Sequence, residues 1–239
     1  LVAAAGCLDL STNPDEIVAI EFPDLPWPSI VAGDTLRDGQ GLVAPLVARL
    51  FDGDGDEVPG AAVVFLTRDT TVAIISGNRV VADSGATGLA RLLASASGIQ
   101  SIVRQLEIVR RPDSMAADGT IDPLRWVVPD DPLLNVSGNL GVRVLSKVST
   151  VPEGVRAWIV SFELQADGRA IPPADTTRVF LVNEAGRPSP VDTTDTQGKA
   201  SRRLRLRVAP GLTQPDTVVV IARAAHRGTP GAHCVAVAL

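Results

Sequence analysis

Polar and apolar side chains alternate along several segments of this chain with a period of two residues. The clearest cases set Trp158, Val160, Phe162 and Leu164 against Ser161, Glu163 and Gln165, and set Leu204, Leu206 and Val208 against Arg203, Arg205 and Arg207. No long stretch with a period of 3.6 residues competes with this pattern. Half-buried antiparallel strands alternate in this way, with one face on a core and one in water. We therefore expect an all-β protein.

The chain also repeats itself. Segment 42–66 resembles 155–182, and 86–92 resembles 196–204; the offset of roughly 110–115 residues is the size of one immunoglobulin-like unit. Turn-forming clusters rich in glycine and aspartate separate the expected strands. These features predict two tandem immunoglobulin-like β-sandwich domains, divided as a tether over 1–16, a first domain over 17–110, a proline-rich linker over 111–132 and a second domain over 133–239.

The expected linker rests on four prolines. They are Pro112, Pro123, Pro129 and Pro132. Proline has no backbone N–H to donate to a sheet and fixes φ, so the segment is expected to be a stiff connection and not a strand.

The composition narrows the classes of function. With 45% apolar and 21% charged residues, the chain of 239 residues is too apolar for a disordered protein. It has no uninterrupted apolar run of the roughly 18 residues that a membrane span needs. A net charge of −5 argues against nucleic-acid binding. Two cysteines cannot build a disulfide framework, and two histidines argue against a metal or acid–base site.

The first seven residues read LVAAAGC. Small residues before a cysteine are typical of the end of a lipoprotein signal peptide, and Cys7 would then carry the lipid. The polar stretch 9–16 suits a tether between a membrane and the first domain. Ala4 stands where the lipobox consensus has leucine, and an ordinary apolar N-terminus with an unmodified cysteine is the alternative.

Several motifs resemble those of bacterial Ig-like (Big) domains. In the first unit these motifs are 32–35, 42–51, 54–60, 69–75, 78–82 and 86–88; in the second, 193–200 is similar to the invasin/intimin branch. The resemblance covers most of 17–110 and 133–239. It implies extracytoplasmic spacers, adhesion modules or accessory domains, on a fold that carries no catalytic residues of its own.

The acidic run from Asp52 to Glu57 is the one segment that suggests calcium. A calcium loop of the EF-hand type needs a glycine at position 6 and a glutamate at position 12. Counted from Asp52, those positions hold Glu57 and Val63. An Asp/Gly-rich hairpin turn explains the run without a ligand, so Asp52, Asp54 and Asp56 stay weak candidates for a surface cation site.

No arrangement of residues predicts catalysis. His226, His233 and Cys234 lie close together near the C-terminus, but nothing nearby completes a four-ligand zinc site. A nucleophile elbow, a P-loop and a Gly-x-Gly-x-x-Gly motif are all absent. We expect no enzyme activity and no cofactor. A bridge between Cys7 and Cys234 remains an alternative if Cys7 carries no lipid.

Contact with a protein partner is the remaining chemistry. Alternation places Arg203, Arg205 and Arg207 on one exposed strand face, where they either bind carboxylates or keep the sheet solvated. Trp27 and Trp126 lie near the expected domain ends, where a tryptophan fills a domain junction or docks on a partner.

These expectations combine into one functional hypothesis. The chain would be a periplasmic or cell-surface scaffold or accessory subunit, lipid-anchored through Cys7, that docks on a larger respiratory, photosynthetic or secretion complex in the membrane. An adhesin or carbohydrate-binding module and a calcium-stabilised spacer are the alternatives. The scarcity of aromatic residues, 3% of the chain, argues against a sugar-stacking platform.

Overall fold

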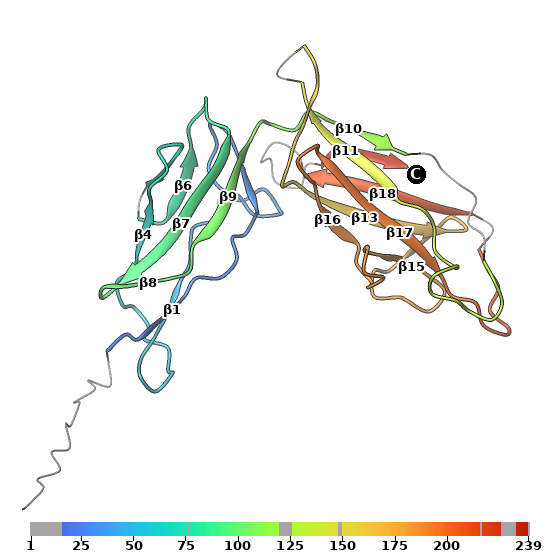
Figure 1. Cartoon of the computed structure of the whole chain (residues 1–239), viewed down its shortest axis with the longest axis horizontal. Coiled ribbons are helices and arrows are strands. Elements are labelled where there is room, and N and C mark those ends of the chain that lie inside the picture. The colour runs from blue at the N-terminus through green and yellow to red at the C-terminus, as the bar shows by residue number, and fades with distance from the viewer. Residues whose placement is uncertain are drawn as a thin grey trace, which may run out of the picture.

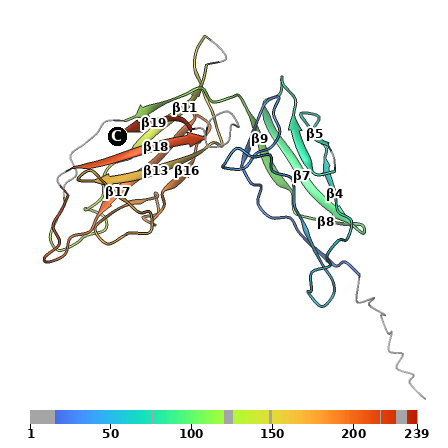
Figure 2. The same cartoon turned by 180° about the vertical axis from the view of Figure 1, so that it is seen from behind.

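The computed structural model describes residues 16–75, 77–119, 126–147, 150–215, 217–225 and 233–238. All regular secondary structure in these ranges is β-strand, from β1 to β19, and the strands form two sandwiches that lie next to each other along the long axis of the molecule (Figures 1 and 2). The described ranges contain no helix long and apolar enough to cross a membrane. The expected all-β class is confirmed.

The first sandwich has one continuous sheet and one divided layer. In the sheet the order is β2-β9-β7-β4, β2 runs parallel to β9, and β8 extends the hairpin from β7. The facing layer consists of the pairs β1–β3 and β5–β6. The bounds are β1 Ala19–Glu21, β2 Ser29–Val31, β3 Arg49–Phe51, β4 Val64–Thr67, β5 Val72–Ile75, β6 Arg79–Ala82, β7 Gly88–Ala96, β8 Ile99–Gln100 and β9 Arg104–Val109.

Alternation along β7 shows why these residues form a half-buried strand. Ala90, Leu92 and Ala94 face the core and are fully buried, while Arg91 between them is exposed. On the edge strand β4, Phe65 turns inward and packs against Phe22 with ring centroids 5.6 Å apart. Apolar burial of this kind is the main favourable contribution to folding.

The second sandwich has the strand order of an immunoglobulin domain. One sheet runs β10-β11-β17-β15, with β12 paired to β11, and the other runs β14-β13-β18-β19, with β16 paired to β13. The bounds are β10 Ser114–Asp118, β11 Leu140–Ser146, β12 Glu153–Gly154, β13 Ile159–Ala166, β14 Arg169–Ile171, β15 Val179–Val182, β16 Val191–Thr193, β17 Lys199–Leu206, β18 Val218–Ala225 and β19 His233–Ala238.

Counted along the chain, the main strands of this sandwich occupy immunoglobulin positions. Constant-type domains place the first, second, fifth and fourth strands in one sheet and the third, sixth and seventh in the other. With the short β12, β14 and β16 set aside, β10-β11-β17-β15 and β13-β18-β19 reproduce both sheets. In the first sandwich, with β2 and the short β8 set aside, β4, β7 and β9 are likewise the third, sixth and seventh strands and share one sheet. Both units are immunoglobulin-like β-sandwiches, as expected.

The two similar stretches of sequence do not occupy equivalent strands. Segment 42–51 ends in β3, the second strand of its sandwich, whereas 155–164 leads into β13, the third strand of the other. Likewise 86–92 leads into β7, a sixth strand, while 196–204 leads into β17, a fifth strand. The similar segments are therefore not equivalent in topology, because a period of two marks a strand without marking its sheet.

The segment 111–132 was expected to hold no strand, and this was wrong. It contains β10, which pairs antiparallel with β11 through five residue pairs, from Ser114 with Leu145 to Asp118 with Gly141. Pro112 and Pro123 lie outside β10, so no proline interrupts the ladder. The first strand of the second sandwich thus begins inside the expected linker.

Candidate functional site

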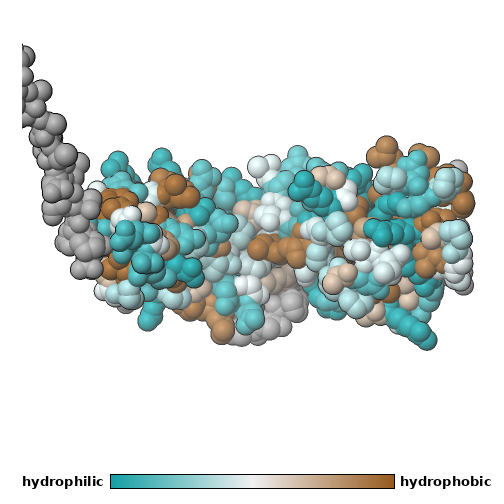
Figure 3. Space-filling view, turned by 90° about the horizontal axis from the view of Figure 1, so that it is seen from below, coloured by the Kyte–Doolittle hydropathy of each residue, from teal (hydrophilic) through white to brown (hydrophobic). Residues whose placement is uncertain are grey.

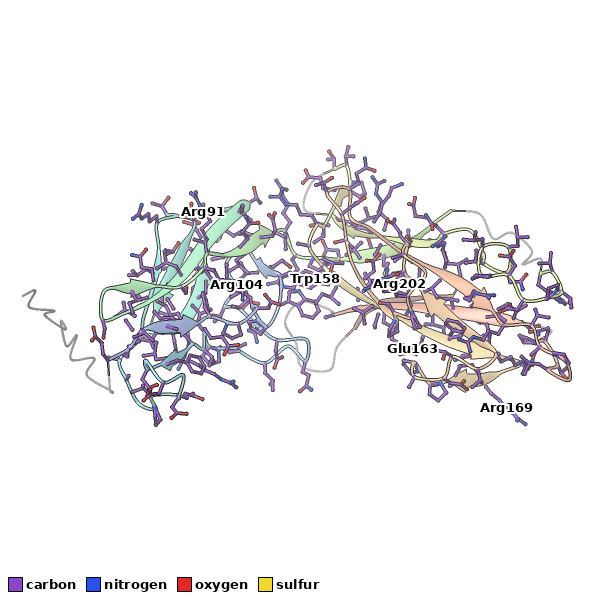
Figure 4. All side chains as sticks on the ribbon, turned by 60° about the horizontal axis from the view of Figure 1, so that its bottom comes forward. Arg91, Arg104, Trp158, Glu163, Arg169 and Arg202 are labelled. Carbon is purple, nitrogen blue, oxygen red and sulfur yellow. The ribbon has the colours of Figure 1, made fainter. Side chains whose placement is uncertain are left out.

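Two tryptophans meet where the sandwiches join. Trp27 and Trp158 are both buried, and their rings pack edge to face with centroids 5.6 Å apart. Figure 4 shows Trp158 between the two sandwiches. Buried apolar side chains of both units form one continuous cluster. An edge-to-face pair contributes about 0.5–1.5 kcal/mol beyond the area that it buries.

Polar contacts surround this aromatic pair. The Ser29 hydroxyl donates to the carbonyl oxygen of Ala157 at 2.8 Å. Arg156 forms an ion pair with Glu107 at 2.9 Å. Arg110 forms a second ion pair with Glu153 at 3.4 Å. The ion pairs are partly exposed, so they set the orientation of the two sandwiches more than they add stability.

The second sandwich holds its side of the junction rigidly. The buried hydroxyl of Thr194 accepts a hydrogen bond from the backbone N–H of Trp158 at 2.8 Å and donates to the carbonyl oxygen of Val155 at 2.7 Å. The indole N–H of Trp158 donates to the carbonyl oxygen of Ala225 at 3.0 Å. Groups of its own sandwich therefore hold Trp158 at both its backbone and its ring, in addition to its contact with Trp27.

A close backbone approach also requires glycine at this end of the sandwich. A Cβ on Gly154 would lie 2.0 Å from the carbonyl oxygen of Gln197. Gly198 adopts a φ of +79°, and its Cβ would lie 2.5 Å from the carbonyl oxygen of Val144. Only glycine lets β12 and the turn before β17 pack this closely.

Arg203 and Arg205 on β17, with Arg207 directly after the strand, do not form the exposed stripe that alternation predicted. They line one groove, but Arg205 is only 7% exposed, because Asp130, Asn135 and Val136 contact it. Its guanidinium pairs with Asp130 at 2.7 Å and donates to the carbonyl oxygens of Asn135 and Leu206. Arg205 therefore has a structural role, and the expectation that it lies on an exposed face is wrong.

The segment over 126–135, which we name the apolar loop, is built around Asn135. Asn135 is fully buried, and its amide group exchanges hydrogen bonds with the backbone of Val127 and donates to Asp130 at 2.9 Å. Desolvation raises the pKa of Asp130, but hydrogen bonds from Asn135 and Arg205 outweigh it and hold the pKa below its ordinary value. The carboxylate thus stays charged beside Arg205.

The other two arginines line a groove on this face. Arg203 donates to the carbonyl oxygens of Asn183 and Glu184 at 3.2 and 2.7 Å. Arg207 is exposed, and its guanidinium lies 5.5 Å from the centre of the Phe180 ring. The groove has a volume of about 880 Å³ and runs between the apolar loop and the turn at 183–188.

A neighbouring groove of about 670 Å³ is lined by four carboxylates and two cations. Lys199 contacts Asp118 at 2.9 Å, and the buried Arg202 contacts Asp192 at 3.1 Å. The two ion pairs neutralise four of these groups, and Glu184 and Asp195 leave the groove with a net charge of −2.

The acidic run after β3 forms a turn. The Asp52 carboxylate accepts hydrogen bonds from the backbone N–H groups of Asp54 and Asp56 at 3.0 and 2.9 Å. Among the residues that the structure describes, no group of three or more His, Cys, Asp or Glu side chains is placed to hold a metal ion. The weak cation site proposed for Asp52, Asp54 and Asp56 gains no support.

The remaining predicted residues have different positions. Trp27 is buried at the junction and is not free for an outside partner, whereas Trp126 on the apolar loop is 48% exposed. Cys7 and His226 lie outside the described residues, as do the side chains of His233 and Cys234.

Sequence reasoning missed Asp130 and Asn135. Their one local signal is the turn-forming composition of Asp130, Asp131 and Asn135 around Pro132. Nothing local connects that turn to Arg205, which lies 75 residues further along the chain than Asp130.

No protein-family model and no curated protein matches the chain. Among solved structures, the adhesin InvE of Yersinia pseudotuberculosis is 16% identical, with a TM-score of 0.34; the match covers 89% of this chain, which spans 56% of the InvE chain. The D0-D1 domain of intimin is 16% identical, with a TM-score of 0.27, covering 93% of this chain and 98% of that one.

Domains 4 and 5 of the S-layer protein SbsC are 10% identical, with a TM-score of 0.34, covering 93% of this chain and 97% of that one. All three TM-scores lie below 0.5. The immunoglobulin-like assignment therefore rests on the strand order of the two sandwiches.

Proposed function

We propose that this protein is a non-enzymatic module that acts outside the cytoplasm at the cell surface, in the manner of an adhesin, as a rigid pair of sandwiches. Its role is to hold the free end of the second sandwich at a fixed distance and angle from the first. The observation that carries the proposal is the junction, where Trp27, Trp158, Ser29 and Ala157 connect the two units directly.

Rigidity follows from the number and variety of these contacts. A flexible tandem pair is joined by a polar linker with few contacts across it. Here the chain passes from β9 into β10 with only residues 110–113 between the strands. Two ion pairs on Glu107 and Glu153 and the buried tryptophan pair resist rotation about that short connection.

Small-angle X-ray scattering tests the rigidity. The wild-type profile should fit one arrangement of the two sandwiches, and a combined Trp27→Ala and Arg156→Ala variant should need a mixture of arrangements. A wild-type profile that already needs a mixture would remove the spacer role. Arg169 on β14, which extends away from the second sandwich in Figure 4, offers the control variant Arg169→Ala.

Exposure at the cell surface and anchoring through Cys7 belong to the same proposal. Protease added to intact producing cells should cleave the protein, and palmitate labelling should be lost in a Cys7→Ser variant. Protection from protease, together with recovery in a detergent-solubilised membrane complex, would instead favour an accessory subunit.

A further inference from the structure

The apolar loop places a polar side chain inside and apolar side chains outside. It buries the amide of Asn135 but leaves a set of large apolar side chains 41–82% exposed: Trp126, Val127, Val128, Leu133 and Leu134. Figure 1 shows the yellow-green segment before β11 at the end of the second sandwich away from the first. Brown, apolar residues also gather at that end in Figure 3. Clustered exposed apolar side chains mark an interaction site.

Hydrogen bonds to β17 hold the apolar loop in this conformation. Asp130 and Asn135 connect it to Arg205, and the backbone N–H of Leu206 donates to the carbonyl oxygen of Asn135 at 2.9 Å. The exposed side chains therefore cannot turn inward without breaking a buried polar network. A binding surface fixed in advance loses less entropy when a partner docks.

The groove beside the loop combines apolar walls with positive charge. Pro132, Leu133, Phe180 and Pro188 provide apolar lining. Three arginines face two carboxylates, so the groove has a net positive charge in a chain whose net charge is −5. A volume of about 880 Å³ lies within the range of about 300–1,000 Å³ typical of ligand sites.

Two of the groove's arginines have donors to spare. Among the described residues, neither Arg203 nor Arg207 forms an ion pair with a carboxylate, and the Nε of Arg203 is buried without a hydrogen-bond partner. The guanidinium of Arg207 lies over the Phe180 ring, 5.5 Å from its centre, a cation–π contact that engages the face of the ring. A guanidinium so placed is suited to a carboxylate that accepts two hydrogen bonds.

We propose that this groove binds an extended protein segment in which a carboxylate lies next to apolar side chains. The carboxylate pairs with Arg203 and Arg207, and the apolar side chains pack between Leu133 and Phe180. Charge complementarity favours this partner, and the concave groove favours a narrow segment over a flat bilayer. This inference rests on the proposed function and gives its partner a chemistry.

Peptide arrays test the inference with the full chain. The probes are 12-residue peptides in which Asp or Glu alternates with Leu, Val or Phe, each with a counterpart that carries Asn or Gln. We expect acidic peptides to bind and their amide counterparts to bind about tenfold more weakly or worse, since a hydrogen bond to a charged group is strong. Titration calorimetry on the best pair gives the ratio.

Variants assign the binding to the groove. Arg207→Gln and Leu133→Ser change exposed side chains, so both should fold, and each should weaken the acidic peptide by about tenfold. Arg169→Gln is the matched control, because Arg169 lies on β14 of the opposite sheet and extends away from the sandwich in Figure 4. It should leave affinity unchanged.

Three results would overturn the inference. They are equal binding of acidic and amide peptides, no effect of Arg207→Gln, and binding of phosphatidylglycerol vesicles but of no peptide. Each leaves the scattering test of rigidity untouched, so a wrong partner can be told from a wrong spacer role.

Discussion

Replacing the charged Asp130 by a neutral residue should lower the stability of the second sandwich, because the ion pair between Asp130 and Arg205 is lost. The carboxylate accepts hydrogen bonds from Arg205 at 2.7 Å, from Asn135 at 2.9 Å and from the backbone N–H of Val208 at 3.2 Å. Asp130→Asn retains the shape and one acceptor oxygen but removes the charge. The guanidinium of Arg205, whose side chain is 9% exposed, is then paired with carbonyl oxygens alone.

The magnitude lies between two limits. An exposed ion pair contributes at most about 1 kcal/mol, and breaking a fully buried one costs about 3–5 kcal/mol. Arg205 is buried, but the Asp130 side chain is 32% exposed. We therefore expect Asp130→Asn to lower the free energy of unfolding by about 1–2 kcal/mol. In a double-mutant cycle with Arg205→Gln, the coupling should be about 1 kcal/mol.

Urea unfolding at several pH values measures both effects. Because its pKa is lowered in the folded state, Asp130 contributes stability that is present above the ordinary aspartate pKa of about 3.9 and is lost as the pH falls through the lowered value. Asp130→Asn should lack that part of the acid dependence. The matched control is Asp54→Asn, a turn residue. Additive single changes, or an unaltered acid dependence, would refute the reasoning.

Three further outcomes are expected. Gly154→Ala should lower the free energy of unfolding by about 1–3 kcal/mol in urea, because its Cβ would collide with a backbone carbonyl; Gly138→Ala, which meets nothing within 4 Å, should not. Side-chain and backbone hydrogen bonds from Arg91 lower the pKa of Asp69, so Arg91→Gln should raise that carboxyl's pKa in an NMR titration, and no change would contradict the contact. Calcium should leave the melting temperature unchanged, since the Asp52 carboxylate already binds backbone N–H groups; a rise would revive the cation site.

The alternation of side chains was sufficient to predict the fold class. Val160, Phe162 and Leu164 are buried on β13, and Leu204 and Leu206 are buried on β17, where the period of two placed them. Such patterns are local, so the sequence displays them directly. The strand order depends on contacts between distant segments. The similar sequence segments therefore fall on strands with different positions in the two sandwiches.

The groove could not be predicted for the same reason. Alternation correctly put Arg205 on the outer face of β17, but it could not show that Asp130, Asn135 and Val136 contact it there. The partner Asp130 lies within the segment that its prolines marked as a linker. Burial of a strand's outer face depends on a distant segment, and a period of two contains no information about that segment.

The proposed spacer role requires that the junction fixes one sandwich against the other. Spin labels at Arg79→Cys on β6 and Arg169→Cys on β14, with Cys7 and Cys234 changed to serine, report the distance between the units by pulsed electron paramagnetic resonance. One narrow distance distribution is expected, which broadens when Trp27→Ala and Arg156→Ala are added. A distribution that is already broad in the parent chain, and unchanged by these substitutions, would contradict it.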